Sequence, residues 1–318
     1  MSIDEMLTIL MVEAAVLAFC VWLFYIYRQL SKSGYRKLSI GHYNLLKKIG
    51  KGGMADIYLA EHKKSKDQVV IKILQVSSSR DKDLVYRFIM EGKNLLAIKK
   101  KYPNSPVVKV HGYNRDKNTG KYFIIMEYLP GKNLKDILDS KQFIALPFKI
   151  HIIKEVAKAL QASHALKIFH RDVSPENIII DGKRVTLIDF GIAKEMDTEH
   201  QTVPGIVLGK FLYISPEQFK GADASEKSDI YSLGVIMFYL LEGKPPYEPL
   251  YPYEIMRRHE SNAVPIITAQ APRELKKFVY RMLEKKTRDR PDAGEVIAMM
   301  RLFLKQAQGR EYKSMSLH

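Results

Sequence analysis

Cysteine is almost missing from this sequence, with Cys20 as its one example among 318 residues. A single thiol forms no disulfide within the chain and builds no zinc site from cysteine ligands. Internal repeats and low-complexity tracts are lacking too. Hydrophobic residues make up 46% of the chain and charged residues 27%, which excludes global disorder and a multi-span membrane protein. The length suggests about two folding units.

Long hydrophobic runs are lacking except for one, which covers residues 6–27 and contains a single charge, Glu13. At 1.5 Å per residue this run spans roughly 33 Å, enough to cross a bilayer core. A signal peptide fits poorly, because there is no basic leader and no small-residue cleavage site. The run therefore predicts a transmembrane helix. Glu13 indicates either a helix–helix contact or a protonated carboxyl near the interface.

Charges on the two sides of this run predict its orientation. Asp4 and Glu5 precede it, and four basic residues follow it, Arg28, Lys32, Arg36 and Lys37. The positive-inside rule then places the N-terminus outside and the rest of a single-pass cell-membrane protein in the cytoplasm.

Acidic residues are in short supply, with 35 Asp and Glu against 51 Lys and Arg, a net charge of +16. Such an excess indicates a polyanionic partner: nucleic acid, a membrane surface or phosphates. Ten Lys and Arg against two acids fall within residues 28–66, next to the predicted membrane segment. We therefore interpret the excess first as membrane-surface charge. No nucleic-acid-binding motif is present, so nucleic acid is not an expected partner.

Periodicity divides the rest of the chain into a β-rich part and a helical part. Strand patterns, separated by turn residues, cover 43–49, 56–62, 68–74, 107–114 and 121–129, with a helical stretch over 81–100. Helical spacing dominates after about residue 133, with one amphipathic helix over 148–166. Residues 228–243 are apolar nearly all round and predict a buried helix that ends at Gly243.

A glycine-rich segment, Gly50-Lys51-Gly52-Gly53, lies between two of the strand patterns. Glycines in such a hairpin let backbone N–H groups approach a phosphate. Glycine hairpins are common, so this signal is weak by itself. No Gly-Lys-Ser/Thr follows, which excludes a nucleotide-binding P-loop.

Further motifs follow the glycines in a fixed order. Lys72 ends the strand motif VVIK, and Glu91 stands in the next helical stretch. Then come HRDVSPEN (170–177), DFG (189–191), YISPE (213–217), DIYSLG (229–234) and RDRP (288–291). With this set, residues 43–305 closely resemble a protein kinase catalytic domain of the bacterial eukaryotic-like Ser/Thr type.

The resemblance implies an α+β bilobal fold, with an N-lobe over 43–127 and a C-lobe over 128–305. A transmembrane helix (6–27) and a basic juxtamembrane linker (28–42) would precede it, and a tail (306–318) would follow. The implied activity is transfer of the ATP γ-phosphoryl group to protein hydroxyls, with Mg²⁺ or Mn²⁺. Protein substrates, ATP and the lipid bilayer are the implied partners; a homodimer and dual specificity stay open.

Site residues follow from the same resemblance. Asp172 would accept the proton of the substrate hydroxyl, and Asn177 and Asp189 would hold the metal ions. Lys72, held by Glu91, would position the α- and β-phosphates. The remaining ATP contacts would be Ile49, Gly50, Gly52, Gly53, Ile57, Val70, the gatekeeper Met126, Glu127 and Leu129 of the hinge, and Ile179. Three residues would act structurally: His170 by packing, Asp229 by bracing the catalytic loop, and Arg290 by pairing with Glu217.

Two positions depart from the family pattern in a way that affects chemistry. Ser174 stands where Ser/Thr kinases usually carry Lys, and Lys210 stands where they usually carry Thr. We expect the two to have exchanged roles, with Lys210 supplying the cation at the phosphoryl site. The alternative is a weakened catalytic loop, and with it a pseudokinase scaffold that binds nucleotide or partners at the membrane. A small-molecule kinase is disfavoured by the complete YISPE segment.

Regulation is predicted from the residue before the catalytic aspartate, Arg171. Kinases with this arginine often require a phosphorylated activation loop. Thr198 and Thr202 lie in that loop and are the candidate autophosphorylation sites. Two ordinary exposed hydroxyls are the alternative.

Overall fold

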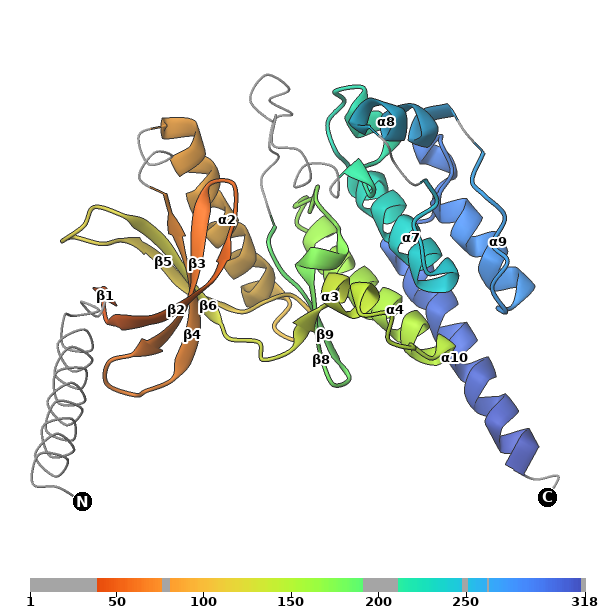
Figure 1. The fold of residues 1–318 in the computed structure, drawn as a ribbon, viewed down its shortest axis with the longest axis horizontal. Helices are drawn as coiled ribbons and strands as arrows, with labels where there is room; N and C mark the ends of the chain where they lie inside the picture. Colours follow the sequence, from red (N-terminus) through yellow and green to blue (C-terminus); the bar gives the residue numbers. More distant parts are fainter. Residues whose placement is uncertain (1–38, 76–80, 191–210, 248–250, 262, 316–318) are drawn as a thin grey trace, which may run out of the picture.

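The structure is a computed structural model that describes residues 39–75, 81–190, 211–247, 251–261 and 263–315. The predicted transmembrane run (6–27) and most of the linker (28–38) lie outside these residues. Within the described ranges, no helix is both long and apolar enough to cross a membrane. Figure 1 shows two lobes, one built on a sheet and one built from helices.

The N-lobe is a six-stranded antiparallel sheet in the order β1-β2-β3-β4-β6-β5. Its strands are β1 (Ser39–Ile40), β2 (Tyr43–Lys51), β3 (Ala55–His62), β4 (Gln68–Leu74), β5 (Val110–Arg115) and β6 (Tyr122–Glu127). Side chains alternate between the two faces of a strand. In β4, Val69, Ile71 and Ile73 therefore pack in a small cluster on one face, which leaves Lys72 on the other.

One long helix, α2 (Lys82–Lys101), completes the N-lobe. Asp81 caps it, because its carboxylate accepts the N–H groups of Asp83 (2.9 Å) and Leu84 (3.2 Å). The helix approaches β5 closely at Gly92, where an added Cβ would lie 3.1 Å from the ring of Tyr113. This close packing fixes the turn of α2 that carries Glu91.

The C-lobe starts with a small three-stranded sheet and continues as helices (Figure 1). The sheet contains β7 (Lys132–Asn133), β8 (Ile178–Asp181) and β9 (Arg184–Leu187). The helices are α3 (Leu134–Asp139), α4 (Leu146–His164), α6 (Pro216–Phe219), α7 (Glu226–Glu242), α8 (Pro252–Ser261), α9 (Arg273–Met282) and α10 (Ala293–Met315). Two 3₁₀ turns, η2 (Pro175–Asn177) and η3 (Thr287–Asp289), complete the described elements.

Helix α7 is the centre of the C-lobe core. Thirteen of its residues are buried, as its all-round apolar pattern predicts. Ser225 caps its start, and Gly243 ends it in a left-handed conformation (φ 74°). Gly234 lets α7 approach the end of α9, where an added Cβ would lie 2.9 Å from Cβ of Met282.

The structure differs from the sequence-based boundaries at three places. The strand predicted over 107–114 begins only at Val110, because the backbone before it pairs with β9: Val108 N–H donates to the Leu187 carbonyl (3.0 Å). The helical region after residue 133 contains β8 and β9. The proposed tail boundary at 306 falls inside α10, which continues to Met315.

Candidate active site

The glycine-rich turn connects β2 and β3 at the edge of the site. Gly52 N–H donates to the Ala55 carbonyl (2.8 Å) and closes the turn. Gly52 and Gly53 are exposed. Gly50 lies against Ile57, because a Cβ added at Gly50 would lie 3.4 Å from the Ile57 side chain. The turn therefore offers backbone to solvent on the side where phosphates are expected.

Lys72 lies between two carboxylates that come from different parts of the chain. Its Nζ donates to both carboxylate oxygens of Glu91 on α2, at 2.8 and 3.0 Å. It also donates to the Asp189 carboxylate, which follows β9. The alternation of β4 and the docking of α2 on the sheet explain why these groups meet. Lys72 therefore links the N-lobe to the metal-binding motif.

The electrostatics of this cluster keep the lysine charged. Burial by itself would lower the pKa of the Lys72 ammonium, but the Asp189 and Glu91 carboxylates outweigh burial and raise that pKa above its usual range. A permanently charged, well-oriented ammonium suits the binding of phosphate oxygens.

Apolar side chains from both lobes line the space beside Lys72. Ile57 and Val70 belong to the N-lobe sheet, and Ile179 belongs to β8. All three are half-buried, as is Leu129, while Met126 is buried. Of the predicted ATP contacts, Ile49 is the most open to solvent among these apolar residues, with 47% exposure.

The hinge residue Glu127 is held at three points. Its N–H donates to the Lys109 carbonyl (2.9 Å), and its carboxylate accepts the Lys109 N–H (2.8 Å) and the Arg184 guanidinium (2.8 Å). Arg184 belongs to the C-lobe sheet, so its ion pair with Glu127 connects the hinge to the C-lobe. Sequence reasoning missed this contact, because no local pattern pairs residues 57 positions apart.

Asp229 organises the catalytic loop from the start of α7. Its carboxylate accepts the backbone N–H groups of His170 (2.9 Å) and Arg171 (2.8 Å), and it contacts His164 Nε2 (2.8 Å). These bonds hold Arg171 in the left-handed region (φ 67°). The bracing of the loop by Asp229 matches the sequence expectation, whereas the His164 contact was missed. The next residue along the chain is Asp172.

The expected metal-binding groups are Asn177, at the end of this loop, and Asp189, which follows β9. Asn177 Nδ2 donates to the Asp172 carbonyl (2.8 Å), which leaves its Oδ1 as the oxygen for a cation. Phe190 is buried against the ring of His170 (centroids 4.6 Å apart) and anchors Asp189. The described residues contain no group of three or more His, Cys, Asp and Glu arranged for a metal. An ion at Asn177 and Asp189 would therefore take its other ligands from phosphates and water.

Ser174 is buried within the catalytic loop, with 1% exposure. Its hydroxyl has no hydrogen-bond partner among the residues that the structure describes. Buried hydroxyls are normally satisfied. Lys210, its expected counterpart, lies outside the described residues, as do Thr198 and Thr202.

A buried ion pair in the C-lobe stabilises the segment next to the catalytic loop. The Arg290 guanidinium donates to both carboxylate oxygens of Glu217, at 2.7 and 2.8 Å. Arg290 is 1% exposed, which agrees with its predicted structural role. Glu217 belongs to the YISPE segment, and the next residue, Gln218, donates to the Arg171 carbonyl (3.2 Å), so this pair supports a segment that contacts the catalytic loop.

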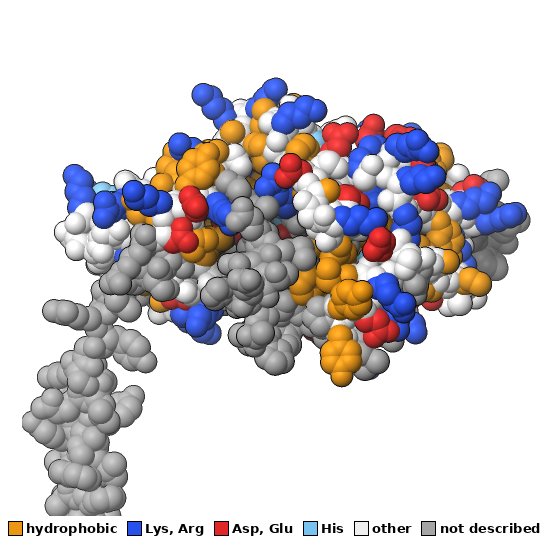
Figure 2. Space-filling view, turned by 90° about the horizontal axis from the view of Figure 1, so that it is seen from above, with side chains coloured by type: hydrophobic (Ala, Val, Ile, Leu, Met, Phe, Trp, Pro, Cys, Tyr) orange, Lys and Arg blue, Asp and Glu red, His pale blue; other side chains and the backbone are white. Residues whose placement is uncertain are grey.

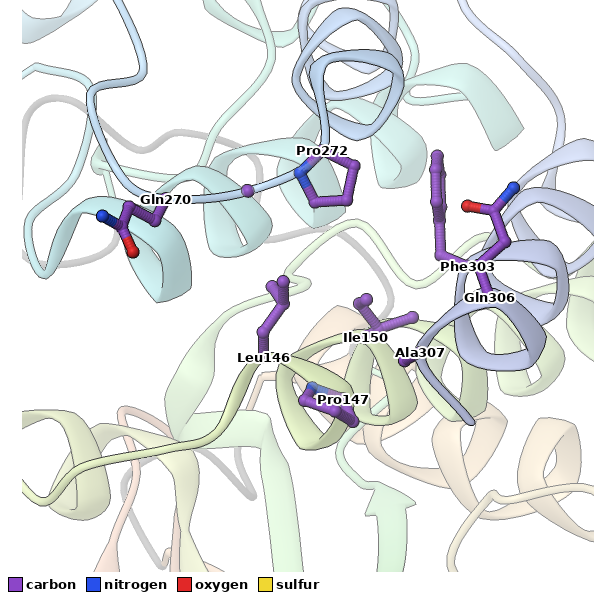
Figure 3. A pocket seen from close by; sticks show the side chains of 9 residues that line it. Leu146, Pro147, Ile150, Gln270, Pro272, Phe303, Gln306 and Ala307 are labelled. Carbon is purple, nitrogen blue, oxygen red and sulfur yellow. The ribbon is translucent and has the colours of Figure 1, made fainter. Parts of the chain in front are cut away.

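A separate groove of about 490 Å³ lies in the C-lobe between α4, α10 and the segment before α9 (Figure 3). Leu146 and Ile150 point toward Pro272 across it (Figure 3). None of its lining residues is a predicted nucleotide or catalytic residue. The groove is therefore not part of the candidate active site.

Known proteins are similar to this chain over most of its two lobes. Residues 43–300 match the family described as "Protein kinase domain". Serine/threonine-protein kinase PrkC of Bacillus subtilis is 34% identical over 69% of this chain and 33% of PrkC. Serine/threonine-protein kinase PknA of Mycobacterium tuberculosis is 31% identical over 75% of this chain and 56% of PknA. The chain thus spans between a third and just over half of these relatives.

Solved structures add support for the fold alone. The kinase domain of Mycobacterium tuberculosis PknI superimposes with a TM-score of 0.63 at 23% identity. The match covers 83% of this chain and 96% of that domain.

Proposed function

Because the chain belongs to the protein kinase family, we propose that it is a serine/threonine protein kinase. It transfers the γ-phosphoryl group of ATP to hydroxyl groups of protein substrates. The relatives named as serine/threonine-protein kinases support this assignment over most of the catalytic domain.

The observation that carries the proposal is the meeting of Lys72 with Glu91 and Asp189. An ammonium fixed by two carboxylates is preorganised to receive phosphate oxygens, so little reorganisation is needed when ATP binds. Asp172 then orients the acceptor hydroxyl and takes its proton, from a loop that Asp229 holds rigid.

The divalent ion fits the chemistry of the residues at hand. The Asn177 amide oxygen and the Asp189 carboxylate are hard oxygen donors of the kind that Mg²⁺ prefers. When bound, the ion neutralises charge on the phosphates. Asn177 and Asp189 would hold the ion beside the Asp172 loop, and Lys72 keeps Asp189 in position before ATP binds.

Ser174 and Lys210 form an exchanged pair in this proposal. The buried Ser174 hydroxyl needs a partner, and the Lys210 ammonium is a suitable donor. Lys210 would then supply the positive charge near the transferred phosphoryl group.

The apolar run at 6–27 anchors the kinase in the cell membrane, with the N-terminus outside and the catalytic domain in the cytoplasm. Support comes from the length of the run and the basic residues that follow it. Autophosphorylation at Thr198 or Thr202 regulates the kinase through Arg171, since a phosphate pairs well with a guanidinium.

The test is phosphoryl transfer from labelled ATP by the purified full-length chain, with a generic protein acceptor and Mg²⁺. The Asp172→Asn variant is the matched control, because it keeps the fold and the ATP contacts. We expect transfer by the parent chain and none by the variant. Nucleotide binding by both without transfer by either would refute the kinase and favour a pseudokinase scaffold. Phosphopeptide mapping of the same two proteins tests autophosphorylation, which predicts phosphothreonine on the parent alone.

A further inference from the structure

The N-lobe gathers basic side chains around the point where the chain enters its sheet. Two turns contact residues 41–42 there: one, with the end of β3, covers residues 61–67, and the other, with the end of β5, covers residues 115–121. Together they carry six cations, and we call this surface the basic end: Lys63, Lys64, Lys66, Arg115, Lys117 and Lys121. Figure 2 shows several Lys and Arg side chains at the left end of the molecule, where the N-lobe lies, and others across the C-lobe.

Backbone contacts tie both turns to the start of the sheet. Lys63 N–H donates to the His42 carbonyl (2.9 Å), and Lys63 Nζ donates to the Gly41 carbonyl (2.8 Å). From the other turn, the Asp116 carboxylate accepts the Gly41 N–H (3.2 Å). The basic end is therefore fixed at residues 41–42, the last two residues of the predicted juxtamembrane linker.

Three acids lie in these turns, Glu61, Asp67 and Asp116, against the six cations, which leaves a net charge of +3. Asp116 is buried (6% exposed) and turned inward, where Thr119 donates to it through N–H (2.9 Å) and hydroxyl (2.7 Å). Glu61 pairs with Lys66 at 3.0 Å, and the exposed Asp67 carboxylate accepts a hydrogen bond from the Ser65 hydroxyl. For Lys64 and Lys117, both exposed, the described residues provide no ion-pair partner. An outward-facing positive charge results.

The opposite end of the molecule is different, although its sequence is also basic. On α9, Lys277 pairs with Glu274 (3.0 Å) and Arg281 pairs with Glu295 (2.9 Å), and Arg290, which follows η3, is buried. Figure 2 shows blue and red side chains interspersed over the C-lobe. Residues 273–290 nevertheless keep eight Lys and Arg against three acids. What singles out the basic end is therefore its contact with residues 41–42, next to the linker cations.

We propose that the basic end is a docking surface for an anionic lipid headgroup layer, which orients the kinase end-on to the membrane. The inference rests on the membrane anchoring proposed above. Residues 28–38 span at most about 40 Å when extended, so an anchored chain keeps the basic end close to the bilayer. Their four cations and lack of acids continue the same charge toward the membrane. Each cation adds about fivefold to attraction for an anionic leaflet.

The test is hydrogen–deuterium exchange of the full chain reconstituted in lipid nanodiscs. Discs of neutral phosphatidylcholine are compared with discs that contain about a third phosphatidylglycerol. We expect slower exchange at 61–67 and 115–121 in the anionic discs, and loss of this protection in high salt. Equal exchange in both kinds of disc would overturn the proposal.

Two charge variants make the test specific. The triple variant Lys64→Gln/Lys66→Gln/Lys117→Gln should weaken docking by about a hundredfold and abolish the protection. The control Lys277→Gln/Lys286→Gln/Arg288→Gln removes the same charge at the other end and should retain it. Equal effects of the two variants, or equal protection by RNA without lipid, would refute a lipid surface.

A separate experiment tests the membrane anchor. A chain that is not retained by neutral vesicles after high-salt washing contradicts the anchor. In that case, sedimentation with anionic vesicles decides the docking surface: binding by the control variant but not by the triple variant supports it, and equal binding contradicts it.

Discussion

Replacing the buried Arg290 by methionine should strongly destabilise the C-lobe. The guanidinium makes five hydrogen bonds: two to Glu217, and one each to the carbonyls of Lys227 (2.9 Å), Glu284 (2.7 Å) and Lys285 (3.2 Å). It also lies 4.7 Å from the centre of the Tyr231 ring. The side chain is 0% exposed, so water cannot replace these partners.

The expected loss of stability follows from the Glu217 carboxylate that the substitution leaves unpaired. A methionine fills much of the space, but Glu217, whose side chain is 16% exposed, keeps a charge without its partner. Breaking a buried ion pair on one side costs about 3–5 kcal/mol. For a domain of this size, 1 kcal/mol corresponds to about 2–4 °C in Tm. The variant should therefore melt roughly 6–20 °C lower.

Thermal unfolding followed by circular dichroism measures this loss. Arg288→Met is the matched control, because its side chain is 78% exposed and pairs loosely with Asp289 at 3.7 Å; it should shift Tm by no more than about 2 °C. The double variant Arg290→Met/Glu217→Met removes both charges and should be more stable than Arg290→Met alone. A fall in Tm no larger than that of the control, or a double variant less stable than the single one, would refute the reasoning.

Three further predictions concern the backbone, a buried histidine and the catalytic loop. Gly131→Ala places a Cβ against the backbone of β8 and should lower stability by about 1–3 kcal/mol, whereas Gly112→Ala, with open space around it, should not; chemical denaturation compares them. Burial lowers the pKa of His259 to about 3. The unfolded chain binds that proton first, so stability should fall as the pH drops below about 6.5, and His259→Gln should flatten this dependence in Tm measurements; an unchanged slope contradicts it. For Ser174→Lys with Lys210→Thr, kinase activity of the double variant should exceed that of either single variant; no gain means that the sites are not coupled.

The local patterns of the sequence were sufficient for much of the fold. Alternation in β4 placed Lys72 opposite the small apolar cluster of Val69 and Ile71. The all-round apolar pattern identified α7, and Gly243 gave its end. Such features depend on neighbours within a few residues, whose spacing decides which face a side chain occupies.

The tertiary structure decided which distant segments meet. Val108 pairs with β9 instead of extending β5, because a backbone edge was available there. Lys72 reaches Asp189, 117 residues away, only when the two lobes close on each other. The turns at 61–67 and 115–121 became one basic surface because both bind residues 41–42. The order and chemistry of the motifs were thus determined by the sequence itself, while their meeting depended on long-range packing that no local period encodes.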